Sequence, residues 1–191
     1  MEALRHLYES VARLQIALAQ AGIPSATIGG LAVMVWGDPR LTRDADLKVL
    51  LGRDEAARLL AALPPDFQPQ ADAPEVMLQQ LGFIFTQDAN QVRIDLLLAD
   101  LGFDAEAIKR GRAVEVLPGL TITVCSPEDL LIYKMISTRA KDQLDLSGIM
   151  RRQRKTLDDA YVEFWLRQFE LALDDSTLVQ TYRTMRQTIG K

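Results

Sequence analysis

The feature that most constrains this chain is a glycine pair followed closely by two aspartates that lead into an apolar segment. Gly29 and Gly30 come after a short apolar run, and Asp44 and Asp46 come directly before residues 47–51. Alternate residues of a strand point to the same face, so the two carboxylates would project side by side at the mouth of a sheet. Glycines let the backbone come close to a bulky ligand. The stretch therefore predicts a site for a metal-bound nucleotide.

Length and composition indicate an ordinary globular protein. The 191 residues suit one domain, or one domain with a helical appendix. The sequence has no apolar run long enough to span a bilayer, no secretory signal profile at its N-terminus and one cysteine, Cys125, which excludes an internal disulfide. We expect a cytoplasmic protein with no membrane partner. The net charge of −4 disfavours an extensive nucleic-acid surface but permits a local basic patch.

Two residues that often carry chemistry are scarce. His6 is the single histidine and lies on a predicted amphipathic helix, so we expect a surface position. Cys125 is expected to be a packed small hydrophobe. With one histidine and one cysteine, the chain has too few residues of these types to favour serine–histidine catalysis, cysteine–histidine catalysis or a zinc site.

Apolar periodicity and turn residues predict strands mixed with helices up to residue 124 and helices alone after it. The predicted strands span residues 26–28, 45–51, 83–86, 92–98, 113–117 and 120–124. The predicted helices span residues 2–21, 30–36, 54–63, 103–110, 127–152, 157–173 and 176–188, the fifth capped by Ser126, with a loop over 64–74. The order predicts an α/β (α+β) fold, with a core domain at 1–125 and a helical part at 126–191 packed on that core.

A third aspartate lies inside an apolar run. Asp95 falls within the predicted strand at 92–98, where a charged side chain is costly to bury without compensation. If this strand lies beside that of Asp44 and Asp46, three carboxylates converge, and each like-charge pair at about 4 Å costs about 4 kcal/mol at an effective dielectric near 20. Two divalent ions would relieve that repulsion. Oxygen ligands favour Mg²⁺ or Mn²⁺ over zinc.

Ion pairs without metal are an alternative for the same carboxylates. Arg40 or Arg43 could pair with the first two aspartates, and Asp95 could pair with Arg93 or Arg112. A glycine pair by itself marks turns of every kind. The order of these features, and their placement on strands, favours the metal site.

The predicted helix at 127–152 carries a second polar set. Four residues fall at steps of four, three and four and so share one helical face, with Asp142 near it: Lys134, Thr138, Lys141 and Asp145. A lysine on an otherwise apolar helix supplies a point charge for a triphosphate, whereas the alternative is a solvated face of ion pairs. Between residues 134 and 155, seven basic residues stand against two acidic ones, a patch that could meet RNA phosphates or an acidic protein.

Taken together, these features resemble the DNA polymerase β-like nucleotidyltransferase superfamily, and within it the AbiEii-type toxins and related minimal nucleotidyltransferases. The matching motifs occur in family order between residues 28 and 146: Gly29-Gly30, Arg40-x-Thr42-x-Asp44-x-Asp46-Leu47, Asp95, and Lys134 with Arg139-x-Lys141-Asp142-x-x-Asp145. The resemblance implies a small mixed β-sheet flanked by helices. Gly30 stands where the family often has a serine, and its spacing from Asp44 is somewhat long.

The resemblance also implies roles for individual residues. The metal-binding and catalytic triad for two Mg²⁺ or Mn²⁺ ions would be Asp44, Asp46 and Asp95, with Lys134 as a further catalytic group. The residues that would hold the nucleoside triphosphate are Gly29, Gly30, Thr42 and Lys134, with Asp142 and Asp145 lining the same site.

The implied reaction transfers a nucleoside monophosphate from a nucleoside triphosphate to a hydroxyl acceptor and releases pyrophosphate. The acceptor would be a tRNA end or a protein, in a toxin–antitoxin or phage-defence setting with a cognate toxin or antitoxin partner. Two alternatives stay open. The chain could be a catalytically weak module of the same fold that acts by binding a partner protein, or a metal-dependent nuclease that uses the same carboxylates.

Overall fold

The computed structural model describes residues 2–100, 102–137 and 139–190, and the chain divides into two compact units. Unit 1 comprises Met1–Leu31 and Leu41–Cys125, and unit 2 comprises Ala32–Arg40 and Ser126–Lys191. Unit 2 contains residues 126–191, the range expected to be the helical part. It also includes residues 32–40, which the sequence analysis had assigned to the core.

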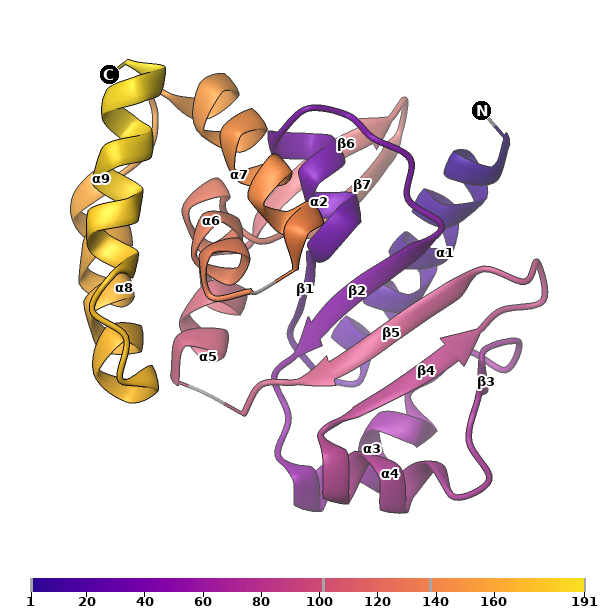
Figure 1. Cartoon of the computed structure of the whole chain (residues 1–191). Helices are drawn as coiled ribbons and strands as arrows, with labels where there is room; N and C mark the ends of the chain where they lie inside the picture. Colours follow the sequence, from indigo (N-terminus) through magenta and orange to yellow (C-terminus); the bar gives the residue numbers. More distant parts are fainter. Residues whose placement is uncertain (1, 101, 138, 191) are drawn as a thin grey trace. The chain divides into compact units, whose positions relative to one another are not determined.

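In its described residues, unit 1 contains a seven-stranded mixed sheet with the order β3-β4-β5-β2-β1-β7-β6 (Figure 1). The strands are β1 (Ser25–Ile28), β2 (Asp44–Val49), β3 (Gln68–Pro69), β4 (Phe83–Gln87), β5 (Arg93–Leu98), β6 (Arg112–Leu117) and β7 (Leu120–Val124). β2 runs parallel to β5, and β1 runs parallel to β7, while the other neighbouring pairs are antiparallel. The mixed sheet confirms the predicted fold class.

Helices cover this sheet and close its connections. They are α1 (Glu2–Gln20), the 3₁₀-helix η1 (Arg53–Glu55), α3 (Ala56–Ala61), α4 (Pro74–Leu81) and α5 (Gly102–Lys109). The helix α2 (Gly29–Trp36) begins in unit 1 and belongs to unit 2 from Ala32 onwards. α1 packs on β7, β1, β2 and β6 through the apolar stripe that the sequence predicted: Leu7, Val11, Leu14 and Leu18. In β2 the buried side chains of Ala45, Leu47 and Val49 alternate with half-buried polar ones, so one face of the strand belongs to the core.

Two elements were missed by the sequence analysis. β3 lies within the segment predicted as a loop, and α4 begins at the last residue of that segment. Pro74 occupies the start of α4, where its missing N–H costs nothing, and Gly82 ends the helix in the left-handed conformation with φ of 73°. Proline and glycine therefore mark the two ends of a helix here rather than a loop.

Unit 2 contains the helices α6 (Pro127–Met135), α7 (Ala140–Gln153), α8 (Asp159–Leu173) and α9 (Leu178–Ile189). α6 packs on α7 and α8, and α9 packs on α7 and α8. α7 also holds residues 32–40, because Arg152 donates a hydrogen bond to the carbonyl of Gly37 at 2.9 Å and Gln153 donates one to the carbonyl of Trp36 at 3.0 Å. Within the described ranges, every helix is too short or too polar to cross a lipid bilayer.

The prediction of one helix over residues 127–152 is wrong. The chain leaves the helix after Met135, and α7 begins only at Ala140. Ser137 donates a hydrogen bond to a carboxylate oxygen of Asp142 at 2.6 Å, and Arg139 adopts an extended conformation with ψ of 131°. Such side-chain hydrogen bonds offer the chain an alternative to the helix, and the apolar periodicity does not reveal them.

The N-terminal cap of α6 is as predicted and gives a test of this local structure. The Oγ of buried Ser126 accepts a hydrogen bond from the backbone N–H of Asp129 at 3.2 Å and donates one to its carboxylate at 2.6 Å. Ser126→Ala should lower the free energy of unfolding by about 1–2 kcal/mol, measured by urea denaturation. Ser147→Ala, at an exposed position of α7, is the control and should change stability little. Equal stability of both variants would show that the cap contributes nothing.

Candidate active site

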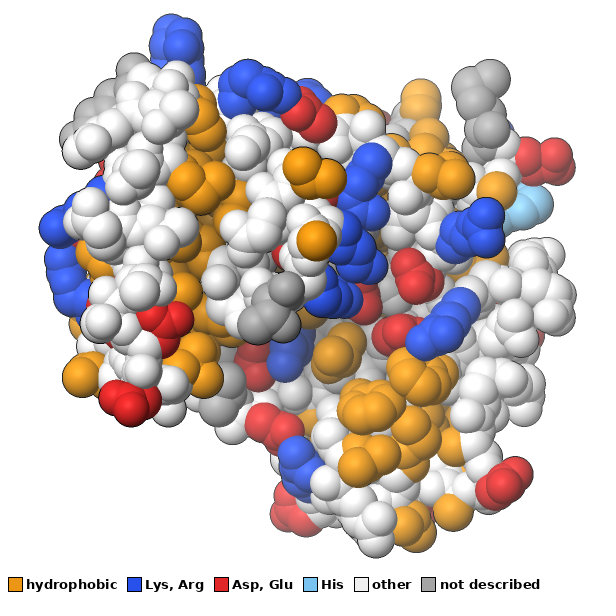
Figure 2. Space-filling view, in the orientation of Figure 1, with side chains coloured by type: hydrophobic (Ala, Val, Ile, Leu, Met, Phe, Trp, Pro, Cys, Tyr) orange, Lys and Arg blue, Asp and Glu red, His pale blue; other side chains and the backbone are white. Residues whose placement is uncertain are grey.

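The structure brings the three predicted aspartates onto one face of the sheet in unit 1. β2 and β5 are neighbours, and their parallel register pairs Asp46 with Asp95 and Asp44 with Arg93. Residues paired in register point to the same face, and neighbouring strands lie about 4.8 Å apart. Acidic and basic side chains accordingly lie together over β2 and β5 in the space-filling view (Figure 2).

Asp95 is held by an arginine of its own strand. Arg93 donates two hydrogen bonds to the carboxylate, from Nε to Oδ1 at 2.7 Å and from Nη2 to Oδ2 at 2.9 Å. The hydrogen bond to Asp95 raises the pKa of Arg93, and the charges of Asp44 and Asp46 add to the same effect. The ion pair between Asp95 and Arg93, one of the alternatives left open by the sequence, is therefore present.

The three carboxylates are suitable ligands for a divalent cation, but their side chains are not arranged around a common point. No three carboxylate, histidine or cysteine side chains among the described residues converge as metal ligands do. Both oxygens of Asp95 accept hydrogen bonds from Arg93 instead. A guanidinium thus already serves as a cation for this group. The oxygen donors that share the face are of the kind that Mg²⁺ and Mn²⁺ prefer.

Thr42 and Gly29 fix the surroundings of the first two aspartates. The Thr42 hydroxyl lies 3.2 Å from Oδ1 of Asp44 and 3.1 Å from its carbonyl oxygen, so it orients that residue. Gly29 begins α2 with φ of 63°, and a Cβ there would lie 1.9 Å from Oδ2 of Asp46. Only glycine permits this approach. The first backbone N–H groups of α2, at the positive end of the helix, therefore lie beside Asp46.

Lys134, in unit 2, is part of a buried ionic cluster. The lysine is only 3% exposed, and its Nζ forms ion pairs with Asp142 and, at 2.9 Å, with Asp145. Asp145 also accepts two hydrogen bonds from Arg40, at 2.7 and 2.9 Å. The second oxygen of Asp142 accepts from Ser137 and, at 2.7 Å, from Arg139. Arg40 therefore pairs with an aspartate of α7 in this structure.

The predicted helical face through Lys134 does not exist in this form. Lys134 lies on α6, whereas Asp142 and Asp145 lie on α7. The side chains meet because the helix is interrupted between α6 and α7. Lys141 is exposed, and Thr138, the fourth residue of the predicted face, lies outside the described residues. Burial alone would raise the pKa of Asp142, but hydrogen bonds from Lys134, Ser137 and Arg139 outweigh it and lower the pKa to about 2.

A cavity of about 350 Å³ in unit 1 lies at the start of the two strands that carry the aspartates. Its lining includes Thr42 and Arg43 just before β2, Val92 just before β5, and His6 of α1. The sequence analysis expected His6 at the surface, and its side chain is partly exposed. Its place beside this cavity depends on two loops that lie near α1, which no local pattern in the sequence signals.

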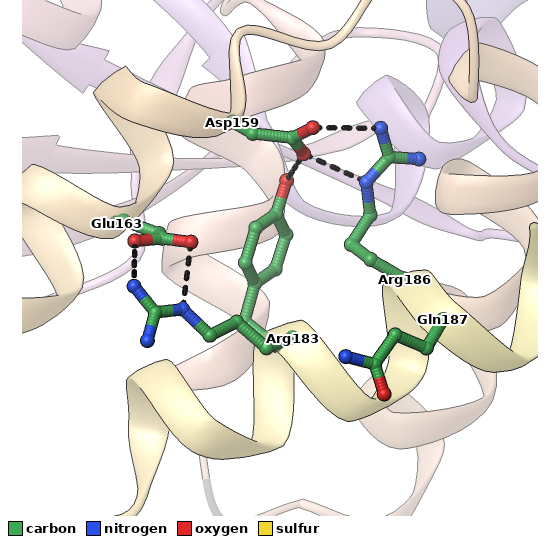
Figure 3. A pocket seen from close by; sticks show the side chains of 6 residues that line it. Asp159, Glu163, Arg183, Arg186 and Gln187 are labelled. Atoms are coloured by element: carbon green, nitrogen blue, oxygen red, sulfur yellow. Dashed lines mark hydrogen bonds and ion pairs between the residues drawn. The ribbon is translucent and has the colours of Figure 1, made fainter. Parts of the chain in front are cut away.

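A smaller cavity of about 180 Å³ in unit 2, between α8 and α9, contains none of the predicted site residues (Figure 3). Arg186 and the hydroxyl of Tyr182 both donate to Asp159, at 2.7 and 2.5 Å. Arg183 donates to both oxygens of Glu163. Burial and the hydrogen bond to Asp159 raise the pKa of Tyr182. These ion pairs and the tyrosine hydrogen bond join α8 to α9, so the residues around this cavity have a structural role.

Comparison with known proteins agrees with this architecture. A family model described as "Nucleotidyl transferase of unknown function (DUF2204)" matches residues 7–180. An antigenic nucleotidyltransferase-like protein from Paracoccidioides brasiliensis has a similar structure, with a TM-score of 0.54 and 17% identity over 91% of this chain and 92% of that one. No curated protein sequence matches the chain.

Two antibiotic-modifying proteins are similar in fold as well. The antibiotic-resistance factor ANT(2'')-Ia aligns with a TM-score of 0.52 and 16% identity, over 87% of this chain and 94% of that one. The lincosamide antibiotic adenylyltransferase LnuA aligns with a TM-score of 0.50 and 12% identity, over 74% and 94%. At such identities the likeness concerns the fold.

The contact between Gly29 and Asp46 predicts that a methyl group cannot be added here. Gly29→Ala should lower the free energy of unfolding by at least about 1 kcal/mol, because the left-handed backbone and the carboxylate both oppose a Cβ. Urea denaturation measures this, with Gly102→Ala as the control because a Cβ at Gly102 meets nothing within 4 Å. A Gly29→Ala protein as stable as the control would contradict the close approach.

The ionic cluster of unit 2 predicts a dependence of stability on pH. The pKa of Asp142 is about 2 in the folded chain and about 3.9 when unfolded, so its contribution is present above pH 4 and is lost as the pH falls towards 2. Asp142→Asn should cost about 2 kcal/mol at pH 7 and much less at pH 2, measured by urea denaturation at both pH values. The exposed Asp72→Asn is the control. A cost for Asp142→Asn that is equal at both pH values would contradict the ionic origin.

Proposed function

Because the chain belongs to the nucleotidyl transferase family whose model spans residues 7–180, we propose that it transfers a nucleoside monophosphate from a nucleoside triphosphate to a hydroxyl acceptor. The proposed reaction uses Mg²⁺ or Mn²⁺ and releases pyrophosphate. The observation that supports it most directly is the register of β2 and β5, which pairs Asp46 with Asp95 and leaves Asp44 on the same face. Three carboxylates on one face of a sheet need cations between them.

The chemistry follows from the positions of these side chains. A pair of divalent ions, when bound, would neutralise the triphosphate and ease the ionisation of the acceptor hydroxyl. Asp44 and Asp46 are the proposed ligands on β2, and Thr42 keeps Asp44 oriented. Asp95 is the proposed base, which takes the hydroxyl proton as the acceptor oxygen bonds to the α-phosphorus and the bond to pyrophosphate breaks. The backbone N–H groups at Gly29 and Gly30 are proposed to hold a phosphate.

The ionic cluster of unit 2 is proposed to bind the nucleotide through its exposed members. Lys134, Asp142 and Asp145 are buried and hold one another, so they would act as the base of the binding surface. Arg40 and Arg139 pair with the same carboxylates, and their side chains are 34% and 62% exposed. Three cations against two carboxylates leave an excess positive charge, which suits a triphosphate.

The acceptor and the setting are proposed from the resemblance. A tRNA end or a protein hydroxyl, in a toxin–antitoxin or phage-defence system, fits the AbiEii-like motifs. ANT(2'')-Ia is an antibiotic-resistance factor and LnuA a lincosamide antibiotic adenylyltransferase, which makes a small-molecule hydroxyl a further acceptor to test. A catalytically weak module that binds a partner protein is the second candidate, favoured by the two hydrogen bonds that already pair Asp95 with Arg93.

Transfer of label distinguishes these functions. The full chain is incubated with each α-³²P-labelled nucleoside triphosphate, Mg²⁺ or Mn²⁺, and either purified tRNA, cell extract or an aminoglycoside. We expect label on one acceptor together with pyrophosphate release, and at least about a 100-fold loss in Asp44→Asn with Asp46→Asn. The exposed Asp54→Asn is the matched control and should transfer normally.

Three outcomes would redirect the interpretation. A double variant that transfers label at the wild-type rate would contradict the proposed ligands. A stable complex with a partner protein and no labelled acceptor would favour the binding module. Shortened RNA without labelled product would favour the nuclease.

A further inference from the structure

Arg93 lies on β5, the strand that also carries Asp95 of the proposed site. It stands two residues before Asp95 on β5, so both side chains project from the same face of the sheet. The two hydrogen bonds engage both oxygens of Asp95 in the fork geometry that guanidinium and carboxylate share. The Asp95 side chain is 15% exposed and that of Arg93 is 48% exposed. The arginine therefore covers a carboxylate that is itself largely shielded from water.

An aromatic ring supports the same guanidinium. The Cζ of Arg93 lies 4.1 Å from the centroid of the Phe85 ring, a favourable cation–π distance. Phe85 is paired in register with Asp95 on β4, and its ring lies 5.3 Å from that of Phe83. The guanidinium thus has two partners, one charged and one uncharged. The ring would remain available to it if the carboxylate were taken by another cation.

The other two aspartates also act on this arginine. Asp44 is its register partner on β2, and Asp46 is the register partner of Asp95. The charges of all three carboxylates therefore act on the guanidinium of Arg93. Arg93 uses one acceptor site on each oxygen of Asp95. A divalent ion bound to Asp95 would therefore lie close to the guanidinium and be repelled by its charge.

We propose that Arg93 is an intrinsic counter-ion of the carboxylates, which positions Asp95 when no divalent ion is bound and competes with a divalent ion for that carboxylate. Cation binding at this site is then an exchange, and Arg93 lowers the affinity for the metal. The inference rests on the proposed function only in taking the three aspartates as metal ligands. It adds a residue that sets how much free metal the protein needs.

Mn²⁺ alone, titrated into the full chain by isothermal calorimetry, tests the exchange. Arg93→Gln should bind Mn²⁺ about three to ten times more tightly than the wild type, the range expected from loss of one partly exposed ion pair. Arg93→Lys should change the affinity less, because lysine keeps the charge but lacks the fork. Arg43→Gln removes the same charge beside Asp44, at an exposed position, and should have a smaller effect than Arg93→Gln.

Thermal unfolding supplies a second measurement that does not depend on transfer activity. Without metal, Arg93→Gln should melt at a lower temperature than the wild type, because the carboxylates lose their counter-ion. Saturating Mn²⁺ should then raise its melting temperature by more than it raises that of the wild type. If Arg93→Gln does not fold, Arg93→Lys carries the same comparison with the same direction.

The outcomes separate this inference from the proposed function. Mn²⁺ affinity that is unchanged or weaker in Arg93→Gln, or raised equally by Arg43→Gln, would overturn the exchange. Absence of Mn²⁺ binding in every variant would overturn it as well. Tighter binding in Arg93→Gln, together with no label transfer by the wild type, would uphold the exchange and refute the transferase reaction.

Discussion

The parallel pairing of β2 with β5 is the constraint on which the site depends. One face of β2 carries side chains that are wholly buried, and the opposite face carries Asp44 and Asp46. The register then sets Asp95 beside Asp46 at the spacing of neighbouring strands. The apolar face fixes the strand in place, because a slip by one residue would expose the core side chains. The free energy gained by burying the apolar face therefore offsets the repulsion between the carboxylates on the other face.

Asp95 on this face and the two carboxylates of the ionic cluster in unit 2 are each paired with basic side chains of their own unit. Arg93 neutralises Asp95, and Lys134 lies between Asp142 and Asp145, which are themselves engaged by Arg139 and Arg40. Buried ions need such partners, since an unpaired charge in an apolar setting is far more costly than a paired one. The residues that resemble family motifs thus have structural roles besides any role towards a nucleotide. A substitution among them would affect stability and activity together.

Features with a local cause were predictable from the sequence, and features with a distant cause were not. The alternation in β2 and β5, the glycine turn and the Ser126 cap are properties of a few neighbouring residues, and the structure has them. The break between α6 and α7 depends on Ser137 bonding to Asp142, and the apolar period continues through it without change. The position of His6 beside the loops before β2 and β5 depends on tertiary packing. Arg93 was one of the two partners, with Arg112, that the sequence left open for Asp95.

The two-residue period of β2 also limits how the chain can change in length. An insertion between Trp36 and Asp44 would be taken up by the loop that joins α2 to β2, so it would leave the phase of the strand intact. One residue inserted or deleted within Asp44–Val49 would turn every following side chain to the opposite face, sending Leu47 to water and charge to the core. Related sequences can therefore differ in the length of the loop, but we expect them to keep the inward and outward alternation of side chains in β2.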